Sequence, residues 1–467
     1  MAPVKAADPR TGDRVVVWFR RDLRVHDHPA LTAAIGMADE VMPLFVADPV
    51  LLRGRHSCAR RTDRLWAAVD ALRSELEARG SGLVVREGDP ASVVVDVARE
   101  VGATEVHVTV DHTPYARRRD AAVASALRRI GSRLVEHPGL LVHEVGSIRT
   151  DAGRPYAIFG PFHRRWQAAP RRPSLPAPER IASPASIIDE APSRFGGPAT
   201  REPVSGGLPL APSGEAGAMR QLEAFLPRLA AYGAERDRLD RDATSHLSAA
   251  LHLGTISPIV LVERVAAIGS GGADRFLAEV AWRDFYAHRL AQEVADGAID
   301  RDPVAWRDDP AAFDAWKAGL TGYPVVDAGM RQLVVEGWLP NRARMIVASF
   351  LVKDLLVDWR LGADHFLRHL EDGDVASNGG NWRWVAGVGP GSAPWFRVFD
   401  PVAQGQRHDP DGRWIRRWLP ELADFSDAHV HEPWLAPSPP AGYPARIVDH
   451  DAARRRALDA SASRRQS

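Results

Sequence analysis

The chain is poor in cysteine and has no long apolar run, and both absences narrow its class. Cys58 is the single cysteine among 467 residues, which excludes an internal disulfide framework and indicates a reducing compartment. The longest apolar runs, such as 347–352, are far too short to cross a bilayer. Residues 1–13 are polar and lack the apolar core of a signal peptide. We therefore expect a cytoplasmic protein with no membrane partner.

An excess of one charge is also lacking. Lysine plus arginine and aspartate plus glutamate number 60 each, so net charge gives no support for a polyanionic partner, and DNA binding would require a local basic patch. No G-x-G-x-x-G turn follows the first apolar run and no Walker-type phosphate loop is present, which argues against the usual Rossmann and P-loop sites. Hydrolase chemistry has no H-E-x-x-H or G-x-S-x-G motif to support it, and we expect no metal site.

The N-terminal part alternates short apolar runs with helical patterns. The strand candidates are 15–19, 41–46, 83–86 and 106–110, and the helix candidates follow Pro29 and cover 59–79 and 120–130. This alternation predicts a parallel, doubly wound α/β sheet. Ligands of such sheets bind beyond the carboxyl ends of the strands, so the loops after Phe19, Val46 and Val110 are the expected docking places.

Length and composition divide the chain into four parts. Its length favours two or three domains. We predict the α/β domain at 14–140, a connector at 141–215 that is rich in proline, glycine and serine, and a helical domain at 216–450. Helical patterns in the last of these include 274–294 and 340–357. The basic segment 451–467 is expected to be a disordered tail.

Tryptophan is unusually frequent in the second half. The chain has 14 tryptophans, and eleven of them lie between Trp282 and Trp434. They could form a large aromatic core, which composition alone favours, or a ring-lined pocket for a flat ligand or for bases.

Hydroxyl side chains gather in the segment 242–251, DATSHLSAAL. Thr244, Ser245 and Ser248 would stand at the start of a helix, where free backbone N–H groups and the helix dipole suit a phosphate or pyrophosphate. An ordinary Ser/Thr cap explains the same pattern, and the segment alone favours the cap.

Two other segments place polar and aromatic side chains on one helical face. Glu279, Trp282, Arg283 and Tyr286 lie at i, i+3, i+4 and i+7 of a helix. Their mixture suits a polar aromatic pocket, whereas an amphipathic helix with a Glu279–Arg283 ion pair explains it equally well. The segment 337–350 similarly brings an amide, a guanidinium and a thioether to one face, in Asn341, Arg344 and Met345, which is a poor description of core packing.

A third segment, 371–384, begins as a turn. Asp372, Gly373 and Asp374 form this turn, and Asp374 is a suitable helix N-cap. The pair of aspartates could also bind a hard cation, but too few further oxygen ligands follow for a calcium loop.

These motifs together resemble the photolyase/cryptochrome family, in particular its class I cyclobutane pyrimidine dimer photolyases. The matching segments occur in the family's order: VVWFRRDLRVHDHPAL, TSHLSAALHLGTISP, EVAWRDFYAH, the long run from Thr321 to Arg360, and DGDVASNGGNWRW. The resemblance covers roughly residues 14–450. It implies an α/β antenna domain joined by a long connector to an all-α FAD-binding domain.

The resemblance also implies which residues hold FAD. Those expected to contact it are Tyr232, Thr244, Ser245, His246, Leu247, Ser248, Arg344, Asp372, Gly373, Asp374 and Asn378. Among them, Arg344 and Asp372 are similar to the ion pair beside the flavin. Asn378 is similar to the residue whose amide faces flavin N5, where plant cryptochromes carry aspartate, so it favours repair over signalling.

By the same resemblance the activity is light-driven repair of a flipped-out pyrimidine dimer by electron transfer from reduced FAD, a carbon–carbon lyase reaction. The residues implied at the lesion are Glu279, Trp282, Asn341, Met345 and Trp384, next to Asn378 of the flavin site. The residues expected to contact DNA are Arg236, Glu279, Trp282, Arg283, Tyr286, Asn341, Arg342, Trp384 and Gln404. Glu279 donates a hydrogen bond only if it is protonated and otherwise accepts one from an N–H, and the sequence leaves both states open.

Asn341 and Met345 bear on which lesion is repaired. The (6-4) photolyases resemble this chain but have histidines at both positions, and a histidine acid suits their proton-dependent repair. Its absence favours cyclobutane dimers. A cryptochrome-type photoreceptor without repair activity is the alternative.

The resemblance further implies a tryptophan relay and a second chromophore. Trp306, Trp359 and Trp382 match the relay that carries electrons from the surface to the flavin. Asp111 and Arg119 are similar to the antenna site of the versions that bind 8-hydroxy-5-deazaflavin, which we therefore expect in preference to methenyltetrahydrofolate. The expected partner is DNA that contains pyrimidine dimers, and the expected state is a monomer.

The sequence departs from the family pattern at several positions. The usual NNGGWQW is NGGNWRW here, with changes at Gly379, Asn381 and Arg383, and Pro340 and Asp400 replace the common histidine and asparagine. These changes bear on flavin-pocket packing and on photoreduction through Trp382.

Overall fold

A parallel sheet forms the N-terminal region of the computed structural model, which describes residues 13–184, 213–297, 304–388, 391, 397–438 and 440–464. Its strands are β1 (Arg14–Phe19), β2 (Glu40–Ala47), β3 (Val84–Glu87), β4 (Glu105–Thr109) and β5 (Arg133–His137). They lie in the order β3-β2-β1-β4-β5, and every pair is parallel. The four strands expected from the sequence are present. The edge strand β5 was not expected, because its sequence, RLVEH, is half polar and offers no apolar run.

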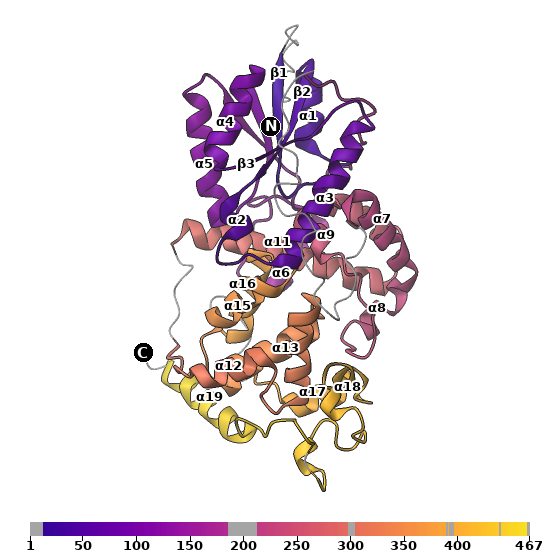
Figure 1. Ribbon diagram of the computed structural model, residues 1–467, viewed down its shortest axis with the longest axis vertical. Coiled ribbons are helices and arrows are strands. Elements are labelled where there is room, and N and C mark those ends of the chain that lie inside the picture. Colours follow the sequence, from indigo (N-terminus) through magenta and orange to yellow (C-terminus); the bar gives the residue numbers. More distant parts are fainter. Residues whose placement is uncertain are drawn as a thin grey trace.

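Helices cover both faces of this sheet (Figure 1), as the doubly wound prediction requires. Val15, Val17 and Phe19 of β1 point to one face, where they pack with α1 (Pro29–Met37) and α3 (Ala59–Glu77). Val16 and Trp18 point to the other face and pack with α4 (Pro90–Val101) and α5 (Pro114–Arg128). Both faces of a central parallel strand are buried, which explains its continuous apolar run. A short helix, α2 (Pro49–Arg53), follows β2.

The connector contains one helix and then follows the α/β domain closely. The helix α6 (Phe159–Ala168) was not expected from the sequence. Residues 169–184 form no regular element, but they bond to the domain through Asp27 N to Leu175 O, Ile181 N to Arg79 O and Val41 N to Ala182 O. The rest of the proline-rich stretch, 185–212, lies outside the described residues.

The second half is helical, as expected. Its helices are α7 (Gly214–Phe225), α8 (Leu229–Glu235), α9 (Ser248–Leu253), α10 (Pro258–Ala266), α11 (Gly271–Ala295), α12 (Pro310–Ala318), α13 (Pro324–Glu336), α14 (Asn341–Ser349), α15 (Trp359–His369), α16 (Val375–Ala386), α17 (Pro401–His408), α18 (Arg413–Trp418) and α19 (His450–Arg464). Short 3-10 turns occur at Leu226–Arg228, Pro420–Leu422 and Pro433–Leu435. None of the described helices is both long and apolar enough to cross a bilayer.

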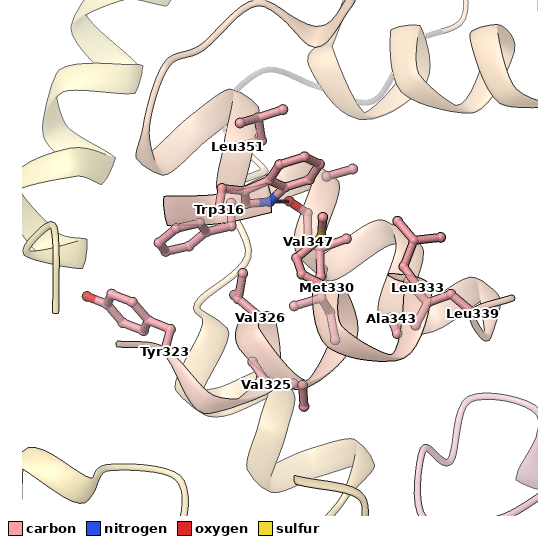
Figure 2. Close-up of a cluster of buried hydrophobic side chains, with 14 of the residues drawn as sticks. Trp316, Tyr323, Val325, Val326, Met330, Leu333, Leu339, Ala343, Val347 and Leu351 are labelled. Carbon is pink, nitrogen blue, oxygen red and sulfur yellow. Dashed lines mark hydrogen bonds between the residues drawn. The ribbon is translucent and has the colours of Figure 1, made fainter. Parts of the chain in front are cut away.

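One buried cluster occupies the centre of this helical half (Figure 2). Trp316 of α12 is fully buried and donates from its indole nitrogen to Val347 O of α14 at 3.0 Å. Met330 and Leu333 of α13 pack in the same cluster, together with Ala343 of α14. A large share of the tryptophans is therefore core, as composition suggested, while others line the cavity described below.

The helix expected over 340–357 is interrupted. It begins after Pro340 as expected, but α14 passes at Phe350–Asp354 into a π-helical turn. Lys353 and Asp354 of this turn are buried, and Lys353 donates to Ala386 O at 3.2 Å. Sequence periodicity does not reveal such a turn because the apolar pattern of 346–352 continues through it.

The expectation of a disordered tail at 451–467 is wrong for residues 451–464, which belong to α19 (His450–Arg464), while 465–467 lie outside the described residues. His450 pairs with the buried Asp354 at 2.5 Å, and Arg456 donates to the carbonyl oxygen of Asp354. Ala453 and Ala457 of this helix are fully buried. A helix that looks too basic and polar to fold alone is thus stabilised by packing against the rest of the protein.

The two halves meet where the loop after β1 packs against the end of α9. Leu23 N donates to Leu253 O at 3.2 Å, and the buried Arg24 donates to Gly254 O at 3.0 Å. Gly254 has a φ of +67°, and a Cβ there would collide with the backbone of Arg21. The loop expected to bind a small molecule therefore binds the helical domain.

Candidate functional site

A cavity of about 480 Å³ lies in the helical half. Its volume falls within the range of roughly 300–1,000 Å³ that is usual for small-molecule sites. Side chains of α11, α14 and α16 form its walls together with the segment 244–252. The predicted site residues that line it are Tyr232, Arg236, Thr244, Ser245, His246, Leu247, Ser248, Glu279, Trp282, Arg283, Tyr286, Asn341, Arg342, Arg344, Met345, Asp372, Asp374, Asn378, Trp382 and Trp384.

The hydroxyl-rich segment reaches the cavity as an irregular turn. Its helix, α9, begins only at Ser248, and no side chain caps it, so the Ser/Thr cap favoured by the segment alone is not found. Thr244 Oγ1 is buried and has no hydrogen-bond partner among the described residues. His246 has a φ of +53°, bonds to Asp242 at 2.6 Å and packs on the ring of Trp338, with centroids 4.1 Å apart. The turn therefore offers polar atoms to a ligand.

Each aspartate of the turn before α16 binds an arginine. Asp372 accepts from Arg344 at 2.8 Å, which is the ion pair expected there. Burial opposes the ionisation of Asp372, but the charge and hydrogen bond of Arg344 outweigh it, so the pKa of Asp372 is lowered. Asp374 caps α16 at Ser377 N and accepts from Arg21 at 2.6 Å. Both carboxylates are thus engaged by guanidinium groups rather than arranged as a cation site.

Arg21 brings the α/β domain to the wall of this cavity. Besides Asp374 it contacts Asp111 at 3.4 Å and the carbonyl oxygen of His252 at 3.1 Å. Burial and the charges of Arg21 and Arg61 lower the pKa of His252 to about 3, so this imidazole is neutral. Burial opposes the ionisation of Asp374, but the charges of Arg21 and Arg283 and the hydrogen bond from Ser377 N outweigh it, so the pKa of Asp374 lies well below its ordinary value. The carboxylate is therefore strongly held as an anion.

Asn378 is fixed on α16. Its side-chain nitrogen donates to Ala363 O of α15 at 2.9 Å, which orients the amide at the cavity wall. Trp382, one turn later, is 2 % exposed and meets Phe366 edge-on at 5.1 Å. Gly362 of α15 lies against the Trp382 ring, and a Cβ at this glycine would collide with it. These contacts give both side chains one position.

Glu279 has a different partner from the one weighed from sequence. It accepts a short hydrogen bond from Arg236 and lies 3.9 Å from Arg275, whereas Arg283 donates to Leu140 O and Leu251 O. The interpretation that Glu279 pairs with Arg283 is therefore wrong. Because a guanidinium has no acceptor, Glu279 acts as a hydrogen-bond acceptor in this pair.

An aromatic ring of the connector packs against the indole of Trp282. The rings of Phe159 and Trp282 are stacked with centroids 3.7 Å apart and planes 8° apart. Tyr286 lies 5.3 Å from Trp282 on the same helix and donates to Asn381 at 3.0 Å. Trp282 and Tyr286 line the cavity and Phe159 does not. Phe159 thus fixes the Trp282 ring without occupying the cavity.

The start of α14 supplies the third wall. Asn341 and Met345 lie one turn apart, with 3.7 Å between the amide nitrogen and the sulfur, and both line the cavity with Arg342. Arg342 pairs with Asp237 at 2.6 Å. Gln404, on α17, does not line the cavity. Arg342 Nε and Gln404 Oε1 are buried and form no hydrogen bond with any residue of the described ranges.

The proposed relay tryptophans share one hydrophobic cluster. Trp382 and Trp359 are buried in it, and Trp306 packs against it. Two arginines lie near the Trp359 ring: Arg360 at 5.1 Å and Arg383 at 5.9 Å from its centroid. The ring centroids of the buried Trp316 and of Trp382 are 6.2 Å apart, and the sequence analysis did not single out Trp316.

The proposed antenna residues lie at the carboxyl end of the sheet, where the α/β pattern predicts a ligand. Asp111 follows β4 and pairs with Arg21, while Arg119 of α5 bonds to Asp120 at 2.9 Å and lies over Trp18 at 4.9 Å. A small cavity of about 30 Å³ beside Asp111 is sufficient only for water. The sequence resemblance therefore remains the basis for the antenna prediction.

The changed motif NGGNWRW is accommodated by specific contacts. Gly380 lies against the ring of Tyr286, and a Cβ there would collide with it, while Gly379 has open space. Asn381 accepts from Tyr286 and donates to Ser377 O at 2.8 Å. Arg383 pairs with Glu293. The departures thus keep the close packing of α16 on α11.

Sequence reasoning missed several residues of the site. They are His252, Arg275 and Trp338 at the cavity wall, Phe159 behind Trp282, and Asp237 beside Arg342. Phe159 lies 123 residues before Trp282, so no local pattern connects the two. The R-D pair at 236–237 was a visible signal for Asp237.

Comparisons with known proteins agree with this geometry. A model of the DNA photolyase domain matches residues 15–179, and a model of the FAD-binding domain of DNA photolyase matches residues 276–463. The chain is 42% identical to the deoxyribodipyrimidine photo-lyase of Streptomyces griseus, over 94% of this chain and 97% of that protein. It is 40% identical to a deoxyribodipyrimidine photo-lyase of Thermus thermophilus, with coverage of 95% and 97%.

The chain belongs to the DNA photolyase family. The crystal structure of a bacterial class III photolyase from Agrobacterium tumefaciens matches with a TM-score of 0.90 and 34% identity, over 99% of this chain and 100% of that one. The Synechocystis cryptochrome matches with a TM-score of 0.86 and 27% identity, over 96% and 99%. The family assignment and the α/β-plus-helical fold class are therefore confirmed, and the photolyase FAD-binding domain is present.

Proposed function

We propose that the protein repairs cyclobutane pyrimidine dimers in DNA, using blue light and a reduced FAD. One observation carries the proposal: a single cavity brings the side chains expected at a flavin together with those expected at a flipped-out lesion. Trp282, Trp384, Glu279 and Asn341 all line it, on three different helices.

The residues of one wall fit FAD. Arg344, Asp372 and the Asn378 amide present opposite charges and hydrogen-bonding atoms, and Thr244 Oγ1 is a buried polar atom that has no hydrogen-bond partner in the part of the chain that the structure describes. An unsatisfied buried hydroxyl is costly, so it indicates a missing ligand or water. These residues would hold a reduced flavin, which would supply under blue light the electron needed to split the dimer.

The residues of the opposite wall fit the lesion. The indoles of Trp282 and Trp384 provide flat surfaces for stacking the extruded bases. The Asn341 amide can donate to a pyrimidine carbonyl, on which negative charge develops when the dimer gains an electron. Glu279, as an acceptor paired with Arg236, is suited to a pyrimidine N–H. We propose that the ionised form is the working form.

The DNA strand would contact the rim of the cavity. Arg236 and Arg342 line it, and Arg342 Nε and Gln404 Oε1 are buried polar atoms that no described residue satisfies with a hydrogen bond. A phosphate or sugar oxygen would accept from Arg342 Nε, whereas the Gln404 amide oxygen, itself an acceptor, would bond to an N–H of a base. Asn341 and Met345, in place of two histidines, favour cyclobutane dimers over (6-4) lesions.

The second chromophore, the place of action and the subunit state complete the proposal. We propose a deazaflavin antenna near Asp111 and Arg119, in a monomeric protein of the cytoplasm. An absorption band beyond that of the flavin in the purified protein, assigned after extraction, tests the first point.

Blue-light repair of a defined oligonucleotide tests the proposal. Purified holoprotein is mixed with an oligonucleotide carrying one cyclobutane dimer, illuminated, and compared with a dark control by chromatography of the product. We expect light-dependent restoration of the two pyrimidines. Intact flavin without repair in the light would favour a cryptochrome-type photoreceptor.

A substitution at Glu279 tests the role of the lesion wall. Glu279→Ala removes the acceptor next to the lesion, and we expect repair per absorbed photon to fall several-fold while flavin absorbance is retained. Glu279→Gln keeps the size and one acceptor and should retain more activity. Equal repair by all three proteins would remove Glu279 from the mechanism.

A further inference from the structure

A chain of alternating charges surrounds one side of the cavity mouth. Arg275, Glu279, Arg236, Asp237 and Arg342 follow one another as ion pairs, which we call the rim network. The three arginines and Glu279 line the cavity, whereas Asp237 does not. Asp237 is therefore placed behind the cations and not at the reacting groups.

Asp237 holds both of the arginines that we propose for the DNA strand. Its Oδ2 accepts from Arg342 at 2.6 Å, and its Oδ1 lies 3.5 Å from Arg236 Nε. Its side chain is one third exposed and that of Arg342 about one fifth, so water screens this charge only in part. Burial opposes its ionisation, but the hydrogen bond and charge of Arg342 outweigh it and lower the pKa of Asp237. It is an anion at neutral pH.

Because acidic and basic residues balance over the whole chain, the negative charge of Asp237 is important for DNA affinity. The whole chain has equal numbers of acidic and basic residues, so no global field attracts DNA. Backbone affinity must come from local arginines, each of which adds roughly 0.9 to the salt slope of duplex binding when it neutralises a phosphate. A carboxylate that already pairs with such an arginine reduces this contribution.

We propose that Asp237 restrains the non-specific affinity of this protein for DNA, so that recognition depends on the lesion in the cavity. This inference rests on the proposed function. The electrostatic contribution to affinity is the same for intact and damaged DNA, whereas stacking in the cavity is available only to an extruded lesion. Because intact sites vastly outnumber lesions, a lower backbone affinity leaves more protein free to reach a lesion.

The binding of intact DNA by Asp237→Asn tests the proposal. The holoprotein is titrated with an undamaged duplex and with the same duplex carrying one cyclobutane dimer, at several salt concentrations, by fluorescence anisotropy. We expect the variant to bind the undamaged duplex roughly 3- to 10-fold more tightly at low salt, with a slope steeper by up to about one. With excess undamaged competitor, its repair of the lesion should become slower than that of the unaltered protein.

Asp96→Asn is the matched control. Asp96 pairs with Arg99 at 3.1 Å on α4, and this variant makes the same change of charge in the α/β domain, away from the cavity. It should leave both affinities unchanged. Asp237→Ala, which also removes the hydrogen bond, should behave like Asp237→Asn, and flavin absorbance with thermal melting shows that each variant is folded.

The outcomes separate this inference from the proposed function. If the unaltered protein does not prefer the damaged duplex, the proposed function fails. If it does, and folded Asp237→Asn binds intact DNA equally or more weakly, Asp237 merely positions Arg342 and the inference is overturned. A gain shared by Asp96→Asn would also overturn it, because net charge and not the rim network would then be responsible.

Discussion

Arginine determines the electrostatics of the site at the scale of single residues. Asp372, Asp374 and Glu279 each accept from a guanidinium group, supplied by Arg344, Arg21 and Arg236 respectively. A buried carboxylate without such a partner costs several kcal/mol. Each of these arginines therefore stabilises a charge that borders the cavity, and its removal would do more than delete one contact.

Arg383 allows a test of the proposed relay. Its guanidinium lies 5.9 Å from the Trp359 ring, and a nearby cation disfavours the loss of an electron from that ring. Arg383→Gln should therefore make photoreduction of the bound flavin by an external thiol a few-fold faster, as followed by flavin absorbance under blue light. Repair by enzyme that is already reduced should not change.

Arg289→Gln is the control for this prediction. Arg289 pairs with the same Glu293 at 3.0 Å and has no described contact with Trp359. An equal acceleration by both variants would assign the effect to Glu293, and no acceleration by Arg383→Gln would contradict the role of the cation.

At this scale, the sequence predicts which residues share a helical face better than it predicts which residues form ion pairs. Helical spacing placed Asn341 beside Met345, and Trp282 beside Tyr286, as the structure has them. The same spacing suggested Arg283 as the partner of Glu279, but the partner is Arg236, 43 residues away in the chain. Such pairs depend on how helices cross, which a local pattern does not contain.

At the scale of elements, an aromatic contact between α6 and α11 shapes the lesion wall. Phe159 stacks on Trp282, Phe162 meets Phe285 at 5.3 Å, and Trp166 donates to the buried Asp284 at 2.9 Å. These three residues of α6 lie on one face, at i, i+3 and i+7. The connector is thereby part of the site.

Replacing Phe159 tests this contribution. Phe159→Leu keeps an apolar side chain but removes the stacked ring, which is worth roughly 0.5–1.5 kcal/mol. We expect dimer-containing DNA to bind about 2- to 10-fold more weakly, while undamaged DNA binds as before and Phe159→Tyr restores the affinity. Anisotropy titrations measure both affinities, and tryptophan fluorescence reports the environment of Trp282.

Phe162→Leu is the comparison for Phe159→Leu. Phe162 is buried among Phe285 and His288 and does not touch the cavity, so its replacement should lower the melting temperature without changing lesion affinity. The same loss of lesion affinity in both variants would show that α6 acts only through general stability.

The sequence predicted the regular elements and missed those that depend on contacts. The four apolar strands and the helices with strong periodicity were foreseen. The edge strand β5 and the helix α19 were not, because each is polar and is stabilised by the elements against which it packs. The helix α6 was not foreseen either, because it is short and has Gly160 and Pro161 in its first turn. The π-helical turn after α14 was hidden because the largely apolar pattern of 346–352 continues into it.

At the scale of the whole molecule, the two domains share one site. The family motifs fixed the fold class, and the comparisons confirm it. They did not show that Arg21, in the loop after β1, reaches Asp374 at the start of α16. Docking of the sheet onto the helical half therefore determines the charge beside the cavity.

Replacing Arg21 tests this dependence. The pKa of Asp374 is depressed, so its pairing stabilises the folded holoprotein above the unfolded value of about 3.8 and is lost as the pH falls through the lower folded value. Without Arg21 the depression is smaller, and Arg21→Gln should release flavin at a higher pH and lower stability by roughly 3 kcal/mol. Flavin fluorescence during acid titration and thermal melting measure the two effects.

The surface pair Arg14–Glu40 provides the reference for Arg21→Gln. Arg14→Gln removes an exposed ion pair of β1 and β2, and we expect less than about 1 kcal/mol and no change in acid release. If Arg21→Gln instead releases flavin at the same pH as the unaltered protein, the two domains bind the cofactor independently.

The Arg21–Asp374 contact also determines when the cofactor site is completed during biosynthesis. The two residues are 353 positions apart, the first near the start of the sequence and the second in its last quarter. At a translation rate of about 5–20 residues per second, the second leaves the ribosome some tens of seconds after the first. The sheet can fold during that interval, but the cofactor has no finished place to enter until the residues that line the cavity, the last of which is Val385, have been made. Loading with FAD is thus confined to the last part of synthesis or to the time after it.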